Sequence, residues 1–128
     1  MKKPVLSMRH ESLYLNDIVE AADHIAGFIA GKDFQAFQES ELLRSAVVQK
    51  LGVIGEAAAR VSGDLTSRHP EVPWPQIVAF RNILIHAYFG IDWVVVWRAA
   101  TNRCPVLRGQ IADILAADFG VHDGSSAE

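Results

Sequence analysis

A short segment of this 128-residue chain carries four polar side chains that could act together on a phosphate ester. Residues 81–88, with the sequence RNILIHAY, place an arginine, an amide, an imidazole and a phenol in an otherwise apolar stretch. An imidazole that titrates near neutral pH can take the proton from a ribose 2′-hydroxyl. A guanidinium can bind the phosphate and stabilise charge on its non-bridging oxygens. His86 is therefore a candidate general base, Arg81 a candidate phosphate-binding residue, and Asn82 a group that orients the imidazole or donates to the phosphate.

The chemistry that these residue types suit is cleavage of RNA by its own 2′-hydroxyl, which leaves a cyclic phosphate. This reaction requires no metal ion and no cofactor. The sequence contains no His-Glu-x-x-His motif or comparable spacing of metal ligands. We therefore expect neither a metal site nor a cofactor.

The spacing within the segment limits which side chains can meet. On an ideal helix, positions four apart differ in direction by about 40° and positions five apart by about 140°. Asn82 and His86 therefore share one face, whereas Arg81 and Tyr88, seven positions apart, share another. Arg81 and His86 can meet only if the helix ends before His86, if the arginine side chain wraps around it, or if two protomers each contribute one copy of the segment to a symmetric cleft.

A purely structural interpretation also fits these side-chain types. Arg81 would be a surface residue, His86 a histidine at a helix end, and Tyr88 a core aromatic residue with a solvated hydroxyl. An arginine five positions before a histidine has little specificity on its own, and residue types alone favour this interpretation.

Hydrophobic spacing throughout the chain predicts an all-α domain, an up-down bundle of four to five helices. We expect helices over residues 12–30, 40–62 and 75 to about 90, and a fourth from 92 that Pro105 kinks or splits near 102–105. Residues 1–11 are expected to be a loose lead-in and 64–75 an irregular segment. The fourth helical segment carries a seam of apolar residues at alternating spacings of four and three: Trp93, Trp97, Ala100, Cys104, Leu107, Ile111 and Ile114.

Particular residues predict where these helices begin and end. Ser12, Ser40 and Asp92 are suitable N-caps, and Gly31 and Gly63 are suitable stops.

Two glycines lie inside the second helix, and each costs about 1 kcal/mol relative to alanine. Close approach of a neighbouring helix at Gly52 and Gly55 would compensate for this cost. Phe34 and Phe37 are expected to fold back onto the core. The other histidines, His10, His24, His69 and His122, are expected on the surface.

Composition predicts a single domain over residues 1–128, with an ordered core of about 12–117 and a flexible tail over 118–128. Half of the residues are hydrophobic and 21% are charged. The net charge of −3 argues against general binding of duplex nucleic acid. No apolar run is long enough to predict a membrane span, and no signal peptide is expected. A single cysteine, Cys104, favours a cytoplasmic location.

Residues 81–88 resemble the Arg-x4-His-x-Tyr motif of HepT-like toxins in the HEPN superfamily. Two further segments agree with this resemblance. Residues 54–58 (IGEAA) resemble the Ile-Gly-Glu-Ala segment of that family's second helix, and residues 73–77 (PWPQI) resemble the tryptophan-containing start of its motif helix. The order of elements matches from about residue 12 to 115.

The resemblance implies a homodimeric helical bundle in which two motifs form one cleft. It implies a metal-independent ribonuclease toxin that cleaves tRNA or mRNA, with Arg81 and His86 catalytic and Asn82 supporting them. It also implies a type II-like or type VII toxin–antitoxin pair. The antitoxin would be a nucleotidyltransferase of the MNT type that transfers AMP from ATP onto Tyr88, where a charged adduct would exclude RNA.

Glu56 has two possible roles. The resemblance places it as a supporting residue near the cleft, whereas its position four residues before Arg60 favours a simple pair on the helix surface. For the whole chain, the alternative to a nuclease is a non-catalytic helical module that pairs with a nucleotidyltransferase subunit.

Overall fold

The computed structural model describes the backbone of residues 5–121 and the side chains of residues 10–121. Within that range the chain is helical and contains no strand. In chain order its elements are α1 (Val5–Ile29), α2 (Phe34–Glu39), α3 (Glu41–Arg60), α4 (Gly63–Arg68), α5 (Trp74–His86), the 3-10 turn η1 (Tyr88–Gly90), α6 (Trp93–Arg98), the π-helical segment η2 (Ala99–Arg103) and α7 (Cys104–Phe119). The predicted all-α bundle is confirmed. No helix in the described range is long and apolar enough to cross a membrane.

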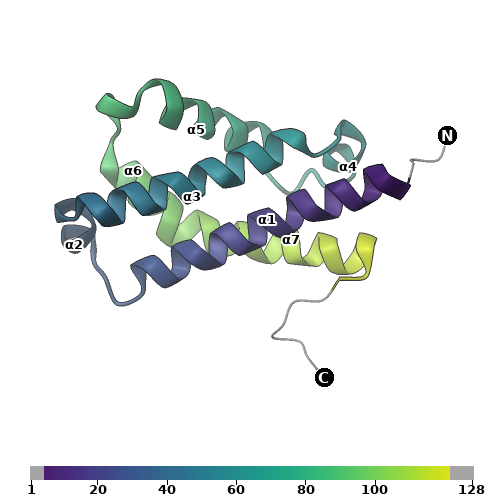
Figure 1. Ribbon diagram of the computed structural model, residues 1–128, viewed down its shortest axis with the longest axis horizontal. Helices are drawn as coiled ribbons and strands as arrows, with labels where there is room; N and C mark the ends of the chain where they lie inside the picture. The colour runs from purple at the N-terminus through teal and green to yellow at the C-terminus, as the bar shows by residue number, and fades with distance from the viewer. Residues whose placement is uncertain (1–4, 122–128) are drawn as a thin grey trace.

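The four long helices form a bundle in which α3 lies between α5 and α1 (Figure 1). The other main neighbour of α1 is α7, and the principal neighbour of α5 is α3. The core fills the space between α1, α3 and α7. Its fully or almost fully buried side chains include Leu15, Ile18, Ile25, Val47, Ile111 and Ile114. The predicted apolar seam is confirmed, since Ala100, Cys104 and Leu107 are also buried and both seam tryptophans pack against this core.

The first helix includes residues 5–11, so the expectation of a loose lead-in there, with Ser12 as N-cap, is wrong; residues 1–4 of the predicted lead-in lie outside the described residues. The added turns carry Glu11 to the end of α3. There its buried carboxylate accepts a hydrogen bond of 2.8 Å from the backbone N–H of Ser62. This contact joins positions distant in sequence, which a helical periodicity cannot reveal. The predicted stop at Gly31 is confirmed, because this residue has a φ of 73°.

The segment between the first two long helices forms a short helix, α2, rather than a plain connection. Asp33 caps it by accepting from the N–H of Ala36 at 2.9 Å. Phe37 is fully buried, with its ring centroid 5.1 Å from that of Trp97, and Phe34 is partly buried against the core. The prediction that both phenyl rings fold back onto the core is confirmed.

Helix α3 begins as predicted, because the Ser40 hydroxyl accepts a hydrogen bond of 3.0 Å from the N–H of Leu43. Two expectations about its far end are wrong. Gly63 opens α4 instead of marking only a stop, and residues 64–75 are therefore not wholly irregular. The Ser62 hydroxyl caps α4, and the fully buried Leu65 holds this short helix to the core.

The last helical segment does not split at Pro105. Asp92 caps α6 as predicted, by accepting from the N–H of Val94 at 3.0 Å. The chain then continues through η2 into α7, and both Ala99 and Cys104 keep right-handed helical backbone angles. Pro105 lies in the first turn of α7. A π-helical turn is wider than an α-helical one, so the missing N–H and the bulk of the proline ring are accommodated without a break.

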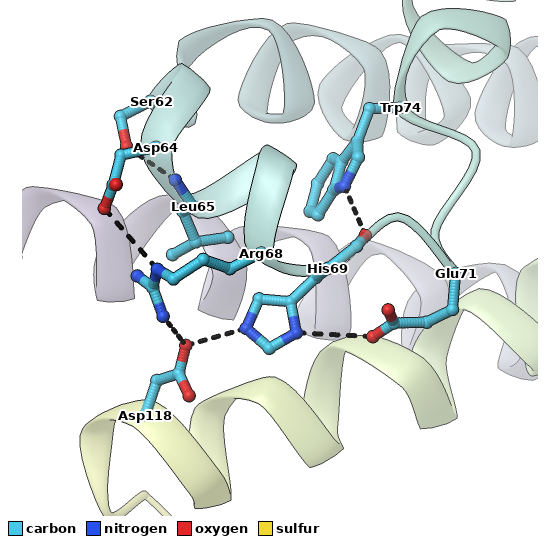
Figure 2. A network of polar contacts seen from close by, with 8 residues as sticks. All are labelled: Ser62, Asp64, Leu65, Arg68, His69, Glu71, Trp74 and Asp118. Carbon is cyan, nitrogen blue, oxygen red and sulfur yellow. Dashed lines mark hydrogen bonds and ion pairs between the residues drawn. The ribbon is translucent and has the colours of Figure 1, made fainter.

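A polar network joins the segment between α4 and α5 to the end of α7 (Figure 2). The two imidazole nitrogens of His69 lie 2.7 Å from Asp118 Oδ2 and 3.3 Å from Glu71 Oε2. Arg68 donates to the same Asp118 oxygen at 2.8 Å, and the Trp74 indole N–H donates to the His69 carbonyl at 3.0 Å. The network therefore holds the start of α5 against α7.

This network corrects two expectations. His69 is largely buried rather than a surface histidine, whereas His10 and His24 are exposed as expected. Asp118 and Phe119 belong to α7 rather than to a tail, and the helix ends at Gly120, which has a φ of 68°. His122 and the rest of the predicted tail, residues 122–128, lie outside the described residues.

Helix α5 approaches α3 most closely at Gly55. A Cβ atom added there would lie 2.3 Å from Arg81 Cβ, which is inside van der Waals contact. The predicted close approach is thus confirmed at Gly55. It is wrong at Gly52, where an added Cβ would meet nothing within 4 Å.

These two glycines form a matched pair for a stability test. We expect Gly55→Ala to lower the free energy of unfolding by about 1–3 kcal/mol, because α5 must move to relieve the overlap. Gly52→Ala should raise it by up to about 1 kcal/mol, because the alanine gains helix propensity without a clash. Urea unfolding followed by circular dichroism measures both, and equal effects of the two variants would contradict the close contact.

The network at Asp118 predicts a pH-dependent contribution to stability. Hydrogen bonding to His69, followed by that to Arg68, lowers the pKa of the Asp118 carboxyl below its usual value. A carboxyl whose pKa is lowered in the folded state stabilises the fold above its unfolded pKa, and this contribution is lost as pH falls through the folded pKa.

We therefore expect Asp118→Asn to cost about 1–2 kcal/mol at pH 7 and to flatten the dependence of stability on pH below about pH 4. Asp113→Asn, at an exposed position of the same helix, is the control. Urea unfolding between pH 3 and pH 7 would contradict this role if the two variants behaved alike.

Candidate functional site

The segment that could do chemistry occupies the carboxyl-terminal half of α5 and the turn that follows. Arg81, Asn82 and His86 lie on α5, whose last residue is His86, and Tyr88 opens η1. The helix starts at Trp74 with Pro75 in its first turn, as predicted. The helix reaches His86 because Ala87 still donates its N–H to the carbonyl of Ile83 at 2.9 Å.

This continuous helix does not bring Arg81 and His86 together within one chain. Of the routes that the sequence left open, an end of the helix before His86 is excluded. The arginine side chain does not wrap around towards His86 either, because its guanidinium points to Glu56 and Asn82. Assembly of the site from two protomers is the remaining route.

The Arg81 guanidinium is held in a defined orientation. Its Nη1 donates to Glu56 Oε1 at 2.5 Å, and its Nε and Nη2 donate to Asn82 Oδ1 at 3.1 and 3.0 Å. The base of the side chain packs on Gly55, and only 19% of the side chain is exposed. Asn82 therefore orients the guanidinium, and its carbonyl oxygen is directed to Arg81 rather than to the imidazole.

His86 has a different environment, although it shares an exposed face of α5 with Asn82. Among the described residues, no group hydrogen-bonds its imidazole or forms an ion pair with it. The ring is accessible, so both nitrogens can reach a substrate or a second protein chain.

Glu56 combines the two roles that the sequence left as alternatives. One carboxylate oxygen binds Arg81, and the other accepts from Arg60 Nη2 at 3.1 Å, one helical turn along α3. Hydrogen bonding to Arg60 and then to Arg81 lowers the pKa of the Glu56 carboxyl. The carboxylate is consequently ionised at neutral pH and links α3 to the motif on α5.

Tyr88 lies at the surface, which argues against its being a core aromatic residue. Its side chain is 38% exposed, and its ring makes edge contacts with Phe89 at 5.7 Å and Trp93 at 6.2 Å between centroids. Trp93 in turn lies under the Arg44 guanidinium at 5.2 Å. These contacts orient the Tyr88 ring, while the residue as a whole remains exposed at the surface.

Sequence reasoning did not single out Phe89, which is fully exposed beside Tyr88. A phenyl ring on a short turn directly before a glycine was the available signal. Ile83 and Ile85 of α5 are exposed as well.

An apolar groove of about 640 Å³ runs between α5 and the segment from α6 to α7. Leu51 and Ile54 of α3 contribute to it, and α5 contributes Ile77, Phe80 and Ile83. The groove is open because α5 packs mainly on α3, which is its principal neighbour among the described elements. Among the described residues, no three His, Cys, Asp or Glu side chains are grouped to hold a metal ion.

Comparisons with known proteins place the chain in a family. The family model described as "Ribonuclease HepT-like" matches residues 18–114. A protein of Thermococcus cleftensis named "Probable ribonuclease HepT" is 38% identical over 97 residues, which cover 76% of this chain and 88% of that protein. Two proteins of Methanocaldococcus jannaschii are provisionally named as RNases. One is 35% identical over 83% of this chain and 97% of its own length. The other is 32% identical over 88% of this chain and 93% of its own length. No solved structure matches the chain significantly.

Proposed function

Given that this chain belongs to the HepT-like ribonuclease family of the HEPN superfamily, we propose that it is an endoribonuclease whose site is formed by Arg81, His86 and Asn82. The observation that carries the proposal is that the carboxyl-terminal half of one helix carries both an oriented guanidinium and an exposed imidazole. The RNase names of its relatives support the same activity. The proposed substrate is tRNA or mRNA.

In this mechanism His86 takes the proton from a ribose 2′-hydroxyl, and the oxygen attacks the adjacent phosphorus. Arg81 binds the non-bridging oxygens and stabilises the charge that builds up on them. The bond to the 5′-oxygen breaks, that oxygen takes up a proton, and a 2′,3′-cyclic phosphate remains. Asn82 supports the reaction by orienting Arg81, and no step requires a metal ion.

The site is proposed to form in a homodimer, with Arg81 of one copy opposite His86 of the other. The separation of these residues within one chain supports this arrangement, because a single copy leaves the site incomplete. The apolar groove beside α5 provides surface that a second copy could bury, because exposed Ile83, Val95 and Val106 line it.

Regulation is proposed to act at Tyr88, as part of a toxin–antitoxin pair in the cytoplasm. The Tyr88 hydroxyl on η1 would accept AMP from ATP, transferred by a nucleotidyltransferase antitoxin of the MNT type. The adduct adds a bulky negative charge two residues from His86, so it would exclude RNA by steric overlap and by repulsion of its phosphates.

The nuclease assignment predicts that cleavage depends on two side chains. In buffer containing EDTA, His86→Ala should slow cleavage of tRNA or mRNA about 100-fold or more, because the general base is lost. Arg81→Ala should have a loss of similar size, because charge on the phosphate is no longer stabilised. His24→Ala, at an exposed histidine of α1, should cleave like the unmodified protein. Equal rates for His86→Ala and the unmodified protein would contradict the assignment.

Mixing the two inactive variants tests whether the site is shared between protomers. Random exchange makes about half of the dimers mixed, and each mixed dimer has one intact site, so about a quarter of the original activity should return. No recovery after subunit exchange would place both residues of a site in one chain. Growth that is unaffected by expression of this chain, together with stable binding of a nucleotidyltransferase, would favour the non-catalytic module instead.

The regulatory proposal predicts a specific modification. Co-expression with an active nucleotidyltransferase encoded beside this chain should add the mass of adenylate at Tyr88 and abolish cleavage. Tyr88→Phe should stay unmodified and active. Tyr14, which is partly buried on α1, is the matched tyrosine and should remain unmodified. Intact-mass and peptide mass spectrometry measure the outcome, and an unchanged mass in the presence of ATP would refute this regulation.

A further inference from the structure

Helix α3 places one carboxylate between two guanidinium groups. Glu56 binds Arg60 through Oε2 at 3.1 Å and Arg81 through Oε1 at 2.5 Å. Arg60 lies on the same helix four residues later, which is the favourable order for a Glu–Arg pair. Arg81 comes from α5, so the two arginines reach the same carboxylate from different helices. The three side chains form a row that we call the Arg60–Glu56–Arg81 triad.

The donors of Arg81 are largely occupied before any substrate is present. Glu56 takes one N–H of Nη1, and Asn82 accepts from both Nε and Nη2. The other two of its five N–H groups are not engaged in these bonds, and a phosphate gains the N–H held by Glu56 only by displacing that carboxylate. Asn82 is neutral, whereas Glu56 carries the same sign of charge as the phosphate. Glu56 is consequently the partner that competes with it directly.

The base of Arg81 is packed closely on α3. Its Cβ lies against Gly55, where even one added carbon atom would overlap it. The arginine side chain therefore begins beside the residue that precedes Glu56, and a phosphate that meets the guanidinium in its observed position meets Glu56 as well. Glu56 has more freedom, since half of its side chain is exposed.

Arg60 offers the carboxylate an alternative partner that needs little movement. Its side chain is 57% exposed and already binds the second oxygen of Glu56. Tyr14 lines the small hollow that also holds Arg60 and Glu56. The bond to Oε2 keeps Arg60 at the carboxylate when Arg81 is engaged elsewhere.

We propose that Glu56 is a built-in competitor of the RNA phosphate for Arg81, and that Arg60 retains Glu56 when the phosphate displaces it. This inference rests on the proposed function, because it concerns the same phosphate-binding arginine. Glu56 and Arg60 are positioning residues in it, and neither touches the RNA. In the free protein Glu56 keeps Arg81 oriented, and on binding the carboxylate shifts to Arg60 alone.

Substitutions that replace a charged side chain by a neutral amide test the role of charge. Glu56→Gln retains an oxygen that can accept from Arg81 but removes the competing charge, so RNA should bind about threefold more tightly. Arg60→Gln leaves Glu56 with Arg81 as its only charged partner, so RNA should bind about threefold more weakly. Asp17→Asn removes one negative charge from the same hollow, where Asp17 forms no ion pair with either arginine, and should leave the affinity nearly unchanged.

The decisive measurement is a double-mutant cycle. If Arg60 acts only through Glu56, Arg60→Gln should have no effect on affinity in the Glu56→Gln background. The probe is a fluorescent 2′-O-methyl RNA oligonucleotide, which has the phosphates but lacks the attacking hydroxyl. Its dissociation constant is measured by anisotropy at physiological salt. With cleavable RNA, Glu56→Gln should lower KM, an effect that loss of structure would not produce.

Three results would overturn the inference. The first is that Glu56→Gln binds the oligonucleotide no more tightly than the unmodified protein. The second is that Asp17→Asn gains as much affinity as Glu56→Gln. The third is that Arg60→Gln weakens binding equally with Glu56 and with Gln at position 56. Absence of binding by the unmodified protein would overturn it as well. Failure of the nuclease proposal is distinguishable, because it would appear as binding of the oligonucleotide without cleavage of unmodified RNA.

Discussion

The contact between Gly55 on α3 and Arg81 on α5 is the constraint on which the rest of the site depends. It has no room for a further carbon atom, so it sets both the separation of the two helices and the position of the arginine. The next residue of α3, Glu56, then lies within hydrogen-bond distance of the guanidinium. A glycine inside a helix costs stability, and here that cost is offset by the close packing of α5 and by an oriented cation.

Helix α5 is held at two places and is otherwise open. The contact with α3 fixes its middle, and the network of His69, Asp118 and Trp74 fixes its start against α7 (Figure 2). Its far end carries His86 and the exposed turn with Tyr88 and Phe89, which lack such anchors. The most firmly held part of the helix thus presents the cation, whereas the imidazole and phenol lie where another molecule can reach them.

Electrostatics explain how an acidic chain could bind RNA locally. A net charge of −3 does not favour contact over a wide surface. At the motif, however, two arginines share one carboxylate, so the Arg60–Glu56–Arg81 triad by itself has a net positive charge. Affinity would come from a few directed contacts, and a neighbouring carboxylate can therefore adjust it strongly.

The sequence by itself determined the features that depend on local interactions. Caps at Ser40 and Asp92, the stop at Gly31 and the apolar seam of the last helices are all found as predicted, because each involves residues within a few positions of one another. The motif at residues 81–88 was likewise visible from residue types and order, as was the family. For the candidate site, the sequence suggested residues but not which of them contact each other.

Tertiary structure decided what depends on packing between distant segments. Gly52 and Gly55 look alike in sequence, yet only Gly55 meets another helix, because the crossing point of α3 and α5 is set by the whole bundle. The same reason explains the buried His69, the contact of Glu11 with Ser62, and the double pairing of Glu56. The continuous α5 also keeps Arg81 and His86 on different faces. Helical spacing alone could not predict this, because it depends on whether the helix ends before or after His86.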